Sequence, residues 1–257
     1  FLPLWPIACQ LVMSESKRPE VELFVKADDA CVHNQIWKMV LYVLKQEDKI
    51  DYSITVVNMN DPPENYKKLD AGRLFPVAWV KSGSIGGEDL SYMKIMSLGS
   101  LEAFLMKLNY PNLNPSLVED DVKRVEEDIE DIYNCLMNCL RNGMGDRLNK
   151  RLTQLNEHLS HQSGQFLLGD RISILDCYLM PKLQHIRLLS RTYKDCDINK
   201  DLTHLWKYIA NMYKTPSFQK TVDPDQQIIS YCGKRIPLPK HIRPVSFGSS
   251  SLTEVPI

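Results

Sequence analysis

Hydrophobic positions follow two different periods along the chain, and the period changes before the middle of the sequence. In the first part, short runs rich in apolar and β-branched residues predict β-strands at residues 21–26, 54–57 and 75–80. Residues 32–45 carry apolar side chains at helical spacing, and residues 61–64 contain the prolines of a helix start. Strands and helices that alternate over about 80 residues predict a small α/β domain.

A stretch rich in proline and asparagine at residues 110–115 interrupts this pattern. After it, apolar residues recur every three or four positions, as in amphipathic helices that pack on a core. The first such series is Val118, Val122, Val125, Ile129, Ile132, Leu136 and Cys139, and the next is Leu148, Leu152, Leu155 and Leu159. Another helix is marked by Leu202, Leu205, Trp206 and Ile209. The second part of the chain is therefore predicted to be all-helical.

These patterns divide the chain into an extension, an α/β domain, a linker, a helical domain and a tail, at residues 1–19, 20–109, 110–116, 117–232 and 233–257. The tail is rich in proline and serine and shows no periodicity, so we expect it to be disordered. The extension is expected to be disordered as well. Its first residues are apolar without a basic flank, which favours an added upstream segment over a trimmed signal peptide.

Charge and cysteine content narrow the classes of function. The 257 residues include 31 basic and 32 acidic side chains, so the chain lacks the basic surplus of a nucleic-acid-binding protein. Its seven cysteines are scattered without metal-ligand spacing, which favours reduced thiols in the cytoplasm over a disulfide framework. Cys135 and Cys139 lie one turn apart, but no further cysteine or histidine stands nearby, and small core residues are the simpler interpretation. We expect no nucleic-acid partner and no metal.

A helix that is apolar on almost every face is predicted after residue 173, and such a helix must lie buried inside a domain. Ser173 and Asp176 stand at its head with the spacing of a capping box, in which side-chain oxygens accept from the free N–H groups of the first turn. A carboxylate is tolerated in this apolar run because it caps the helix, since an unpaired buried charge is costly. We assign both residues a structural role.

The same stretch, Phe166-Leu-Leu-Gly-Asp-x-x-Ser-x-x-Asp-Cys-x-Leu-x-Pro-Lys-Leu-x-His, resembles the buried sixth helix of the glutathione-transferase fold. Its Asp176-Cys and Met180-Pro-Lys-Leu motifs are similar to those of one branch of that fold, the chloride intracellular channel family. The invertebrate members of this family look nearest. The resemblance covers roughly residues 20–232. It implies a thioredoxin-like N-terminal domain followed by an all-helical C-terminal domain. It also implies a cis peptide bond between Phe75 and Pro76.

The resemblance places the glutaredoxin-like cysteine of the family at Cys31, between a predicted strand and a predicted helix. A helix N-terminus stabilises a thiolate and lowers its pKa, so cysteine is a sensible residue there. In the family, the cis proline faces this cysteine and presents backbone groups to glutathione. Cys31 is therefore the candidate catalytic residue, and Cys31, Phe75 and Pro76 are the candidate glutathione-binding residues.

The chain departs from the family at this site. The family's Cys-Pro-Phe-Ser/Cys-Gln reads Cys31-Val-His-Asn-Gln here, and Asn34 at the resolving position excludes an intramolecular disulfide. Asp28 and Asp29 would oppose a thiolate, whereas a protonated His33 would favour it. The acidic and polar pair that holds the γ-glutamyl end of glutathione in related transferases has two competing counterparts, Glu88-Asp89 and Ser100 with Glu102.

The segment proposed to span membranes in the family corresponds to residues 31–57. It contains Lys38, Lys45, Glu47, Asp48, Lys49 and Asp51. Each charge at the centre of a membrane costs roughly 2.5–3.5 kcal/mol on insertion scales. The uninterrupted apolar part, residues 36–44, is also far shorter than the ~20 residues that a span needs. Permeation of a bilayer would therefore require refolding or oligomerisation.

Three functions follow from these patterns. The first is a chloride intracellular channel-like protein: cytoplasmic, reversibly associated with intracellular or plasma membranes, conducting chloride and organising vesicles or tubules. The second is a glutathione-dependent thiol oxidoreductase or transferase that uses Cys31. The third is a non-catalytic scaffold on the same fold, with cytoskeletal or scaffold proteins as partners. We expect the first, and whether the chain is an enzyme stays open at this point.

Overall fold

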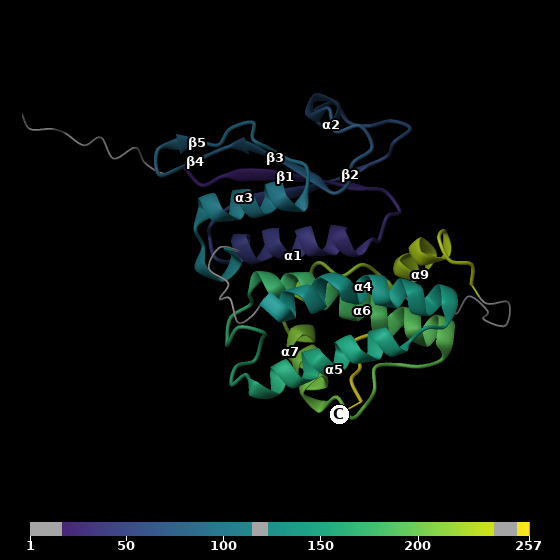
Figure 1. The fold of residues 1–257 in the computed structure, drawn as a ribbon. Helices are drawn as coiled ribbons and strands as arrows, with labels where there is room; N and C mark the ends of the chain where they lie inside the picture. The colour runs from purple at the N-terminus through teal and green to yellow at the C-terminus, as the bar shows by residue number, and fades with distance from the viewer. Residues whose placement is uncertain (1–16, 115–122, 239–250, 257) are drawn as a thin grey trace, which may run out of the picture.

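The computed structural model describes residues 17–114, 123–238 and 251–256. A mixed sheet with its helices forms one end of the molecule and a group of helices forms the other, with α1 between them (Figure 1). The two parts follow one another in the sequence, as the change of hydrophobic period predicts.

The sheet has the strand order β2-β1-β3-β6. Its strands are β1 (Glu20–Lys26), β2 (Asp51–Val57), β3 (Val77–Ser82) and β6 (Lys94–Ile95). β1 runs parallel to β2 and antiparallel to β3, with Leu23 opposite Ile54 on one side and Ala78 on the other. A small hairpin of β4 (Ser84–Ile85) and β5 (Glu88–Asp89) follows β3. The three longer strands lie where the sequence predicts them.

Alternation along β1 assigns its side chains to two cores. Leu23 belongs to the large core that includes α1 (Val32–Gln46), whereas Phe24 packs with Tyr66 of α2 (Glu64–Leu69) on the opposite face. Successive side chains of a strand point to opposite faces, so one strand serves both layers. α1 and α3 (Leu98–Leu108) cover one face of the sheet, and α2 lies on the other (Figure 1).

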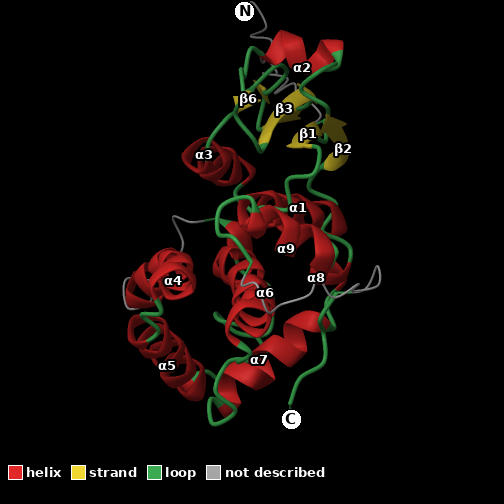
Figure 2. Cartoon of the chain, turned by 90° about the vertical axis from the view of Figure 1, so that its right-hand side faces the viewer, coloured by secondary structure: helices red, strands yellow, loops and turns green. Residues whose placement is uncertain are grey.

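The second part of the chain is helical in its described residues, as predicted, whereas Val118 and Val122 of the first predicted series lie outside them. A short 3-10 turn, η1 (Pro111–Leu113), leads into it, and the helices are α4 (Lys123–Asn142), α5 (Asp146–His161), α6 (Ile174–Lys194), α7 (Thr203–Tyr213), α8 (Pro216–Gln219) and α9 (Asp225–Gly233). α6 packs against α1, α4, α7 and α9 and so occupies the centre of the molecule. The alternative view shows α6 surrounded by the other helices and close to α1 (Figure 2).

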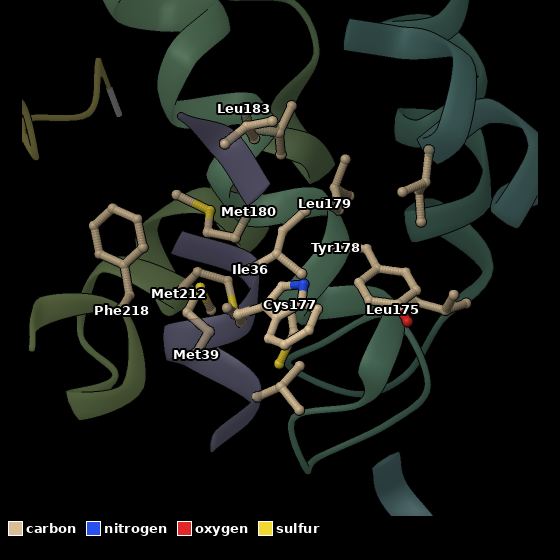
Figure 3. Close-up of a cluster of buried hydrophobic side chains, with 14 of the residues drawn as sticks. Ile36, Met39, Leu175, Cys177, Tyr178, Leu179, Met180, Leu183, Met212 and Phe218 are labelled. Atoms are coloured by element: carbon tan, nitrogen blue, oxygen red, sulfur yellow. The ribbon is translucent and has the colours of Figure 1, made fainter. Parts of the chain in front are cut away.

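The contact between α1 and α6 joins the two parts of the chain through apolar side chains. Ile36 and Met39 of α1 lie among Cys177, Leu179 and Met180 of α6 in the close-up view (Figure 3). All five side chains are at most 3% exposed. Burial of this kind contributes roughly 25 cal/mol for each Å² of apolar surface removed from water, so the interface is a major part of the core.

The capping box at the start of α6 is confirmed. The Ser173 hydroxyl accepts from the backbone N–H of Asp176, and the Asp176 carboxylate accepts from the backbone N–H of Ser173. The same carboxylate accepts from the backbone N–H of Leu167 at 3.0 Å. Asp176 is fully buried, and these donors replace the water that it loses.

The two ends of the described chain differ from the expected disorder. Residues 233–238 continue from α9, and residues 251–256 run as an extended segment whose main chain contacts α6. Lys17 exchanges hydrogen bonds with Ser84, which fastens the last residues of the expected extension to β4. Tertiary contacts order these stretches although their sequences show no periodicity. The remaining residues of the two segments lie outside the described part of the chain.

Candidate functional site

Cys31 stands at the junction of β1 and α1, where the sequence predicts it. It is the N-cap residue of α1 and is 7% exposed. Its position at a helix N-terminus favours a thiolate, because the free N–H groups of the first turn present positive potential. Burial acts in the opposite direction, because it disfavours the charged form.

At this cysteine the effect of burial on the pKa is larger than that of the helix N-terminus. Burial raises the pKa of the Cys31 thiol to about 11, and the nearby Asp29 carboxylate adds to the rise, while the backbone N–H groups of Asn34 and His33 oppose it. The pKa of His33 is itself lowered, first by desolvation of its ring and then by the Lys182 ammonium. The ring is therefore neutral at pH 7 and supplies no positive charge to the thiol. Cys31 is a protonated thiol at neutral pH.

The helical part of the chain closes over the Cys31 loop. The Lys234 ammonium, just after α9, donates to the carbonyl oxygen of Asp28 at 3.1 Å. Tyr133 of α4 and Tyr231 of α9 lie close enough to Cys31 for electrostatic interaction with its thiol. These interactions join residues about 100 to 200 positions apart in the sequence.

Buried polar atoms surround the first turn of α1. The Asn34 side-chain amide donates to the carbonyl oxygen of Asp29, so the residue at the resolving position stabilises the loop. Asp29 Oδ1, Asn34 Oδ1 and both amide atoms of Gln35 are buried without a hydrogen-bond partner among the described residues. Such atoms can bind water or a small polar molecule.

The peptide bond between Phe75 and Pro76 is cis, as the resemblance implies. Pro76 precedes β3, and Cys31 follows β1. Because these strands are antiparallel, the end of β1 and the start of β3 lie next to each other, and so do the two residues. The Phe75 ring stacks on the Tyr66 ring at a centroid distance of 5.1 Å. The antiparallel register therefore brings Pro76 and Cys31 to the same end of the two strands. The Phe75 ring packs on the face of the sheet that α2 covers.

The candidate residues for the γ-glutamyl end of glutathione all have other partners. Glu88 forms an ion pair with Lys107 at 2.5 Å, and Asp89 accepts from the backbone N–H of Ser91. Glu102 accepts from the hydroxyl of Tyr178 at 2.8 Å. Ser100 belongs to a capping box that starts α3. These contacts and the protonated thiol do not fit a glutathione site that works through a thiolate.

An ion pair that the sequence did not reveal lies about two turns along α1 from Cys31. Lys38 Nζ contacts Asp223 Oδ1 at 2.6 Å, and both side chains are at most 16% exposed. The two residues are 185 positions apart. No local sequence pattern predicts which residue pairs with Lys38. A lysine between buried residues of an amphipathic helix indicates only that it needs an acidic partner.

Within residues 17–114, 123–238 and 251–256, no three or more His, Cys, Asp or Glu side chains gather in a way that could hold a metal ion. Cys135 instead donates to the Asp131 carboxylate at 3.2 Å. No helix in these ranges combines the length and the apolar character that crossing a membrane takes.

Sequence comparisons identify relatives over most of the chain. A family model for the C-terminal domain of glutathione S-transferase matches residues 140–211. Chloride intracellular channel Clic of Drosophila melanogaster is 31% identical over 223 residues, which cover 83% of this chain and 81% of that protein. Chloride intracellular channel exc-4 of Caenorhabditis elegans is 36% identical over 86 residues, 34% of this chain and 30% of that protein.

Solved structures agree with these relatives. The crystal structure of EXC-4, the chloride intracellular channel homologue of C. elegans, matches with a TM-score of 0.75 at 25% identity and covers 93% of this chain and 94% of that chain. Dehydroascorbate reductase of Chlamydomonas reinhardtii matches with a TM-score of 0.62 at 18% identity, covers 84% of this chain and 98% of that chain, and shares the fold alone. The glutathione-transferase fold is thus confirmed, and the chain belongs to the chloride intracellular channel family.

Proposed function

We propose that this protein acts as a chloride intracellular channel-like protein that resides in the cytoplasm, associates reversibly with intracellular or plasma membranes and conducts chloride there. The observation that carries the proposal is the 31% identity to the Drosophila chloride intracellular channel over 83% of the chain. The buried, protonated thiol of Cys31 supports it indirectly, because it weakens the enzymatic alternative.

The proposal gives α1 a specific part in membrane association. α1 lies between the sheet and α6, so its apolar face reaches lipid only when it leaves α6 (Figure 1). Separation exposes the apolar side chains of the interface, and if α8 and α9 stay with α6 it also breaks the Lys38–Asp223 ion pair, because Asp223 lies between α8 and α9. We infer that the membrane-bound state separates α1 from α6 and that this pair opposes the step.

Chloride efflux from liposomes tests the proposal. Purified protein is added at acidic pH to vesicles loaded with chloride, and external chloride is followed with an electrode. We expect efflux above the protein-free level, unchanged in Cys31→Ser because the thiol has no part in conduction. Vesicles loaded with a self-quenching fluorescent dye control for general leakage, because dye release reports a loss of membrane integrity. Absence of efflux with protein that binds the vesicles would contradict the proposal.

The enzymatic alternative has its own test. Reduction of a mixed disulfide between glutathione and a model thiol would assign thiol oxidoreductase activity if it were lost in Cys31→Ala. The orphaned polar atoms of Asp29, Asn34 and Gln35 give this alternative its structural basis, since they could bind a polar molecule. If neither chloride efflux nor disulfide reduction is observed, the scaffold function remains, in which cytoskeletal or scaffold proteins are the partners.

A further inference from the structure

The C-terminal residues 251–256 lie in a groove whose floor is buried and polar. Gln184 and Arg187 of α6 are 0% and 1% exposed, and Asp225 at the start of α9 is 4% exposed. Tyr213 of α7 completes this set, since its hydroxyl accepts from Arg187 and donates to Gln184, each at 2.7 Å. We call these four residues the groove residues. Buried polar groups of this kind are costly unless each finds a partner.

The groove residues bind the main chain of the C-terminal segment. Gln184 Nε2 donates to the carbonyl oxygen of Leu252 at 3.1 Å, and an Arg187 nitrogen donates to the carbonyl oxygen of Glu254 at 2.7 Å. The backbone N–H of Leu252 donates to the Asp225 carboxylate. Three main-chain groups of the segment thus interact with three side chains from α6 and α9. Side chains arranged in this way can bind a peptide backbone in extended conformation.

Side chains of the segment supply the apolar contacts. Leu252 and Val255 are partly buried, and Val255 packs against the large core. The side chains between them, Thr253 and Glu254, are exposed. The segment therefore contributes two apolar anchors separated by two outward-facing residues.

The segment resembles a bound ligand more than an integral element of the fold. It forms no helix or strand, and groove side chains bind two of its main-chain carbonyls, while the Ser251 hydroxyl donates to the carbonyl oxygen of Asp223 at 3.4 Å. The groove is rigid by comparison, because Arg187 is held by Asp197 and stacks 4.6 Å from the centroid of Trp206. In Figure 2 the segment runs as an extended loop beside α8 towards the C-terminus.

We propose that the groove residues form a binding site for extended peptide segments, that residues 251–256 occupy it as an internal ligand, and that a segment of the same chemistry in a partner protein binds by displacing them. The chemistry is a serine followed by leucine, two polar residues and valine, in extended conformation. This proposal is independent of chloride conduction and of Cys31.

A labelled synthetic peptide covering residues 251–257 tests the site. The double variant Leu252→Asp, Val255→Asp of the full chain removes both anchors of the internal ligand and leaves the groove residues intact. We expect the labelled peptide to bind this variant at least tenfold more tightly than the wild-type chain, measured by fluorescence anisotropy, because the variant's own segment competes less. Circular dichroism verifies that the variant is folded.

Matched peptides define the specificity. A Thr253→Ala peptide should bind as tightly as the natural one, since Thr253 is exposed, whereas a Val255→Asp peptide should bind at least tenfold more weakly. Equal binding of all three peptides would overturn the proposal. So would failure of the natural peptide to bind the folded variant.

A measurement on the wild-type chain decides the question if the variant does not fold. Hydrogen exchange with mass spectrometry follows the backbone amides of residues 251–256 in the intact protein. Excess natural peptide should accelerate their exchange by displacing the segment, and the Val255→Asp peptide should not. Unchanged exchange at saturating natural peptide would contradict a site open to displacement.

Discussion

At the scale of single residues, the chemistry of Cys31 depends on a balance between its helix position and its burial. The helix N-terminus and the backbone N–H groups of His33 and Asn34 favour the thiolate, but burial and the Asp29 carboxylate raise the pKa to about 11. We predict that Asp29→Asn lowers this pKa and makes Cys31 alkylate severalfold faster near pH 8, because it removes the larger of the two carboxylate contributions that add to the effect of burial. Iodoacetamide rates against pH measure the change, with Cys31→Ser subtracted for the other thiols.

Asp28 provides the control for that experiment. It lies next to Asp29 in the same loop but is exposed, and it is not among the groups that shift the Cys31 thiol. Asp28→Asn should leave the alkylation rate unchanged. An equal acceleration in both variants would show that loop opening, and not the charge of Asp29, controls the reactivity of Cys31.

The cap of α6 is a second residue-scale feature. Ser173→Ala removes an N-cap and should lower the free energy of unfolding by about 1 kcal/mol. Asp176→Ala should cost more, because it leaves the buried N–H groups of Leu167 and Ser173 without partners, at about 1–3 kcal/mol for each. Urea unfolding measures both. Ser97→Ala is the matched control, since Ser97 caps α3 with an exposed capping box.

A smaller loss for Asp176→Ala than for Ser97→Ala would contradict this ranking. The expected order follows from solvent access. Water replaces a lost partner at an exposed cap, whereas the N-terminus of α6 is buried and water cannot reach it.

At the scale of elements, the contact between α4 and α6 contains a buried histidine. His185 Nδ1 lies 3.2 Å from the hydroxyl of Tyr133, and burial, helped by His33, lowers the pKa of His185 to about 3. In the unfolded chain a histidine has a pKa of about 6.5, so the unfolded state takes up this proton first as pH falls. The contribution of neutral His185 to stability is therefore complete above pH 6.5 and is lost as pH falls towards 3.

We predict that His185→Phe reduces the dependence of stability on pH between 6.5 and 4, because phenylalanine fills the site without a titrating ring. Some stability at pH 7 is lost with the hydrogen bond to Tyr133. Urea unfolding at several pH values separates the two effects. His204→Gln, at an exposed position of α7, should leave the pH dependence unchanged, and an equal effect of both substitutions would refute the assignment to His185.

At the scale of the whole molecule, the two parts of the chain meet along α1. Among the described residues, the Lys38–Asp223 ion pair joins them and is largely shielded from solvent. We predict that a double-mutant cycle of Lys38→Met and Asp223→Asn gives a coupling free energy of about 1–2 kcal/mol. Partly buried charges interact more strongly than exposed ones because water screens them less. Chemical unfolding of the four proteins measures the coupling.

The exposed pair Lys67–Glu64 is the control, since both side chains are at least 50% exposed. It should show no measurable coupling. A Lys38–Asp223 coupling as small as that of the control would mean that the pair does not hold the two parts together. The role given to it in membrane association would then fail as well.

Local sequence determined most of the architecture. The alternation of β1, the helical spacing of α1 and the change of period after residue 110 each follow from side-chain burial in a regular element, which repeats along the sequence itself. The capping box at Ser173 and Asp176 was predictable for the same reason, because cap and first turn lie three residues apart. The position of Cys31 at a helix start was likewise determined by the strand and the helix on either side of it.

Only the tertiary structure decided the chemistry of these elements. The pKa of Cys31 depends on burial and on Asp223, which the fold brings near from a distant position, and no local pattern reports that burial. The C-terminal segment lacks any periodicity, yet it is ordered because Gln184, Arg187 and Asp225 bind its backbone. Periodicity reveals which face of an element is buried, whereas the partner that buries it is determined by the fold as a whole.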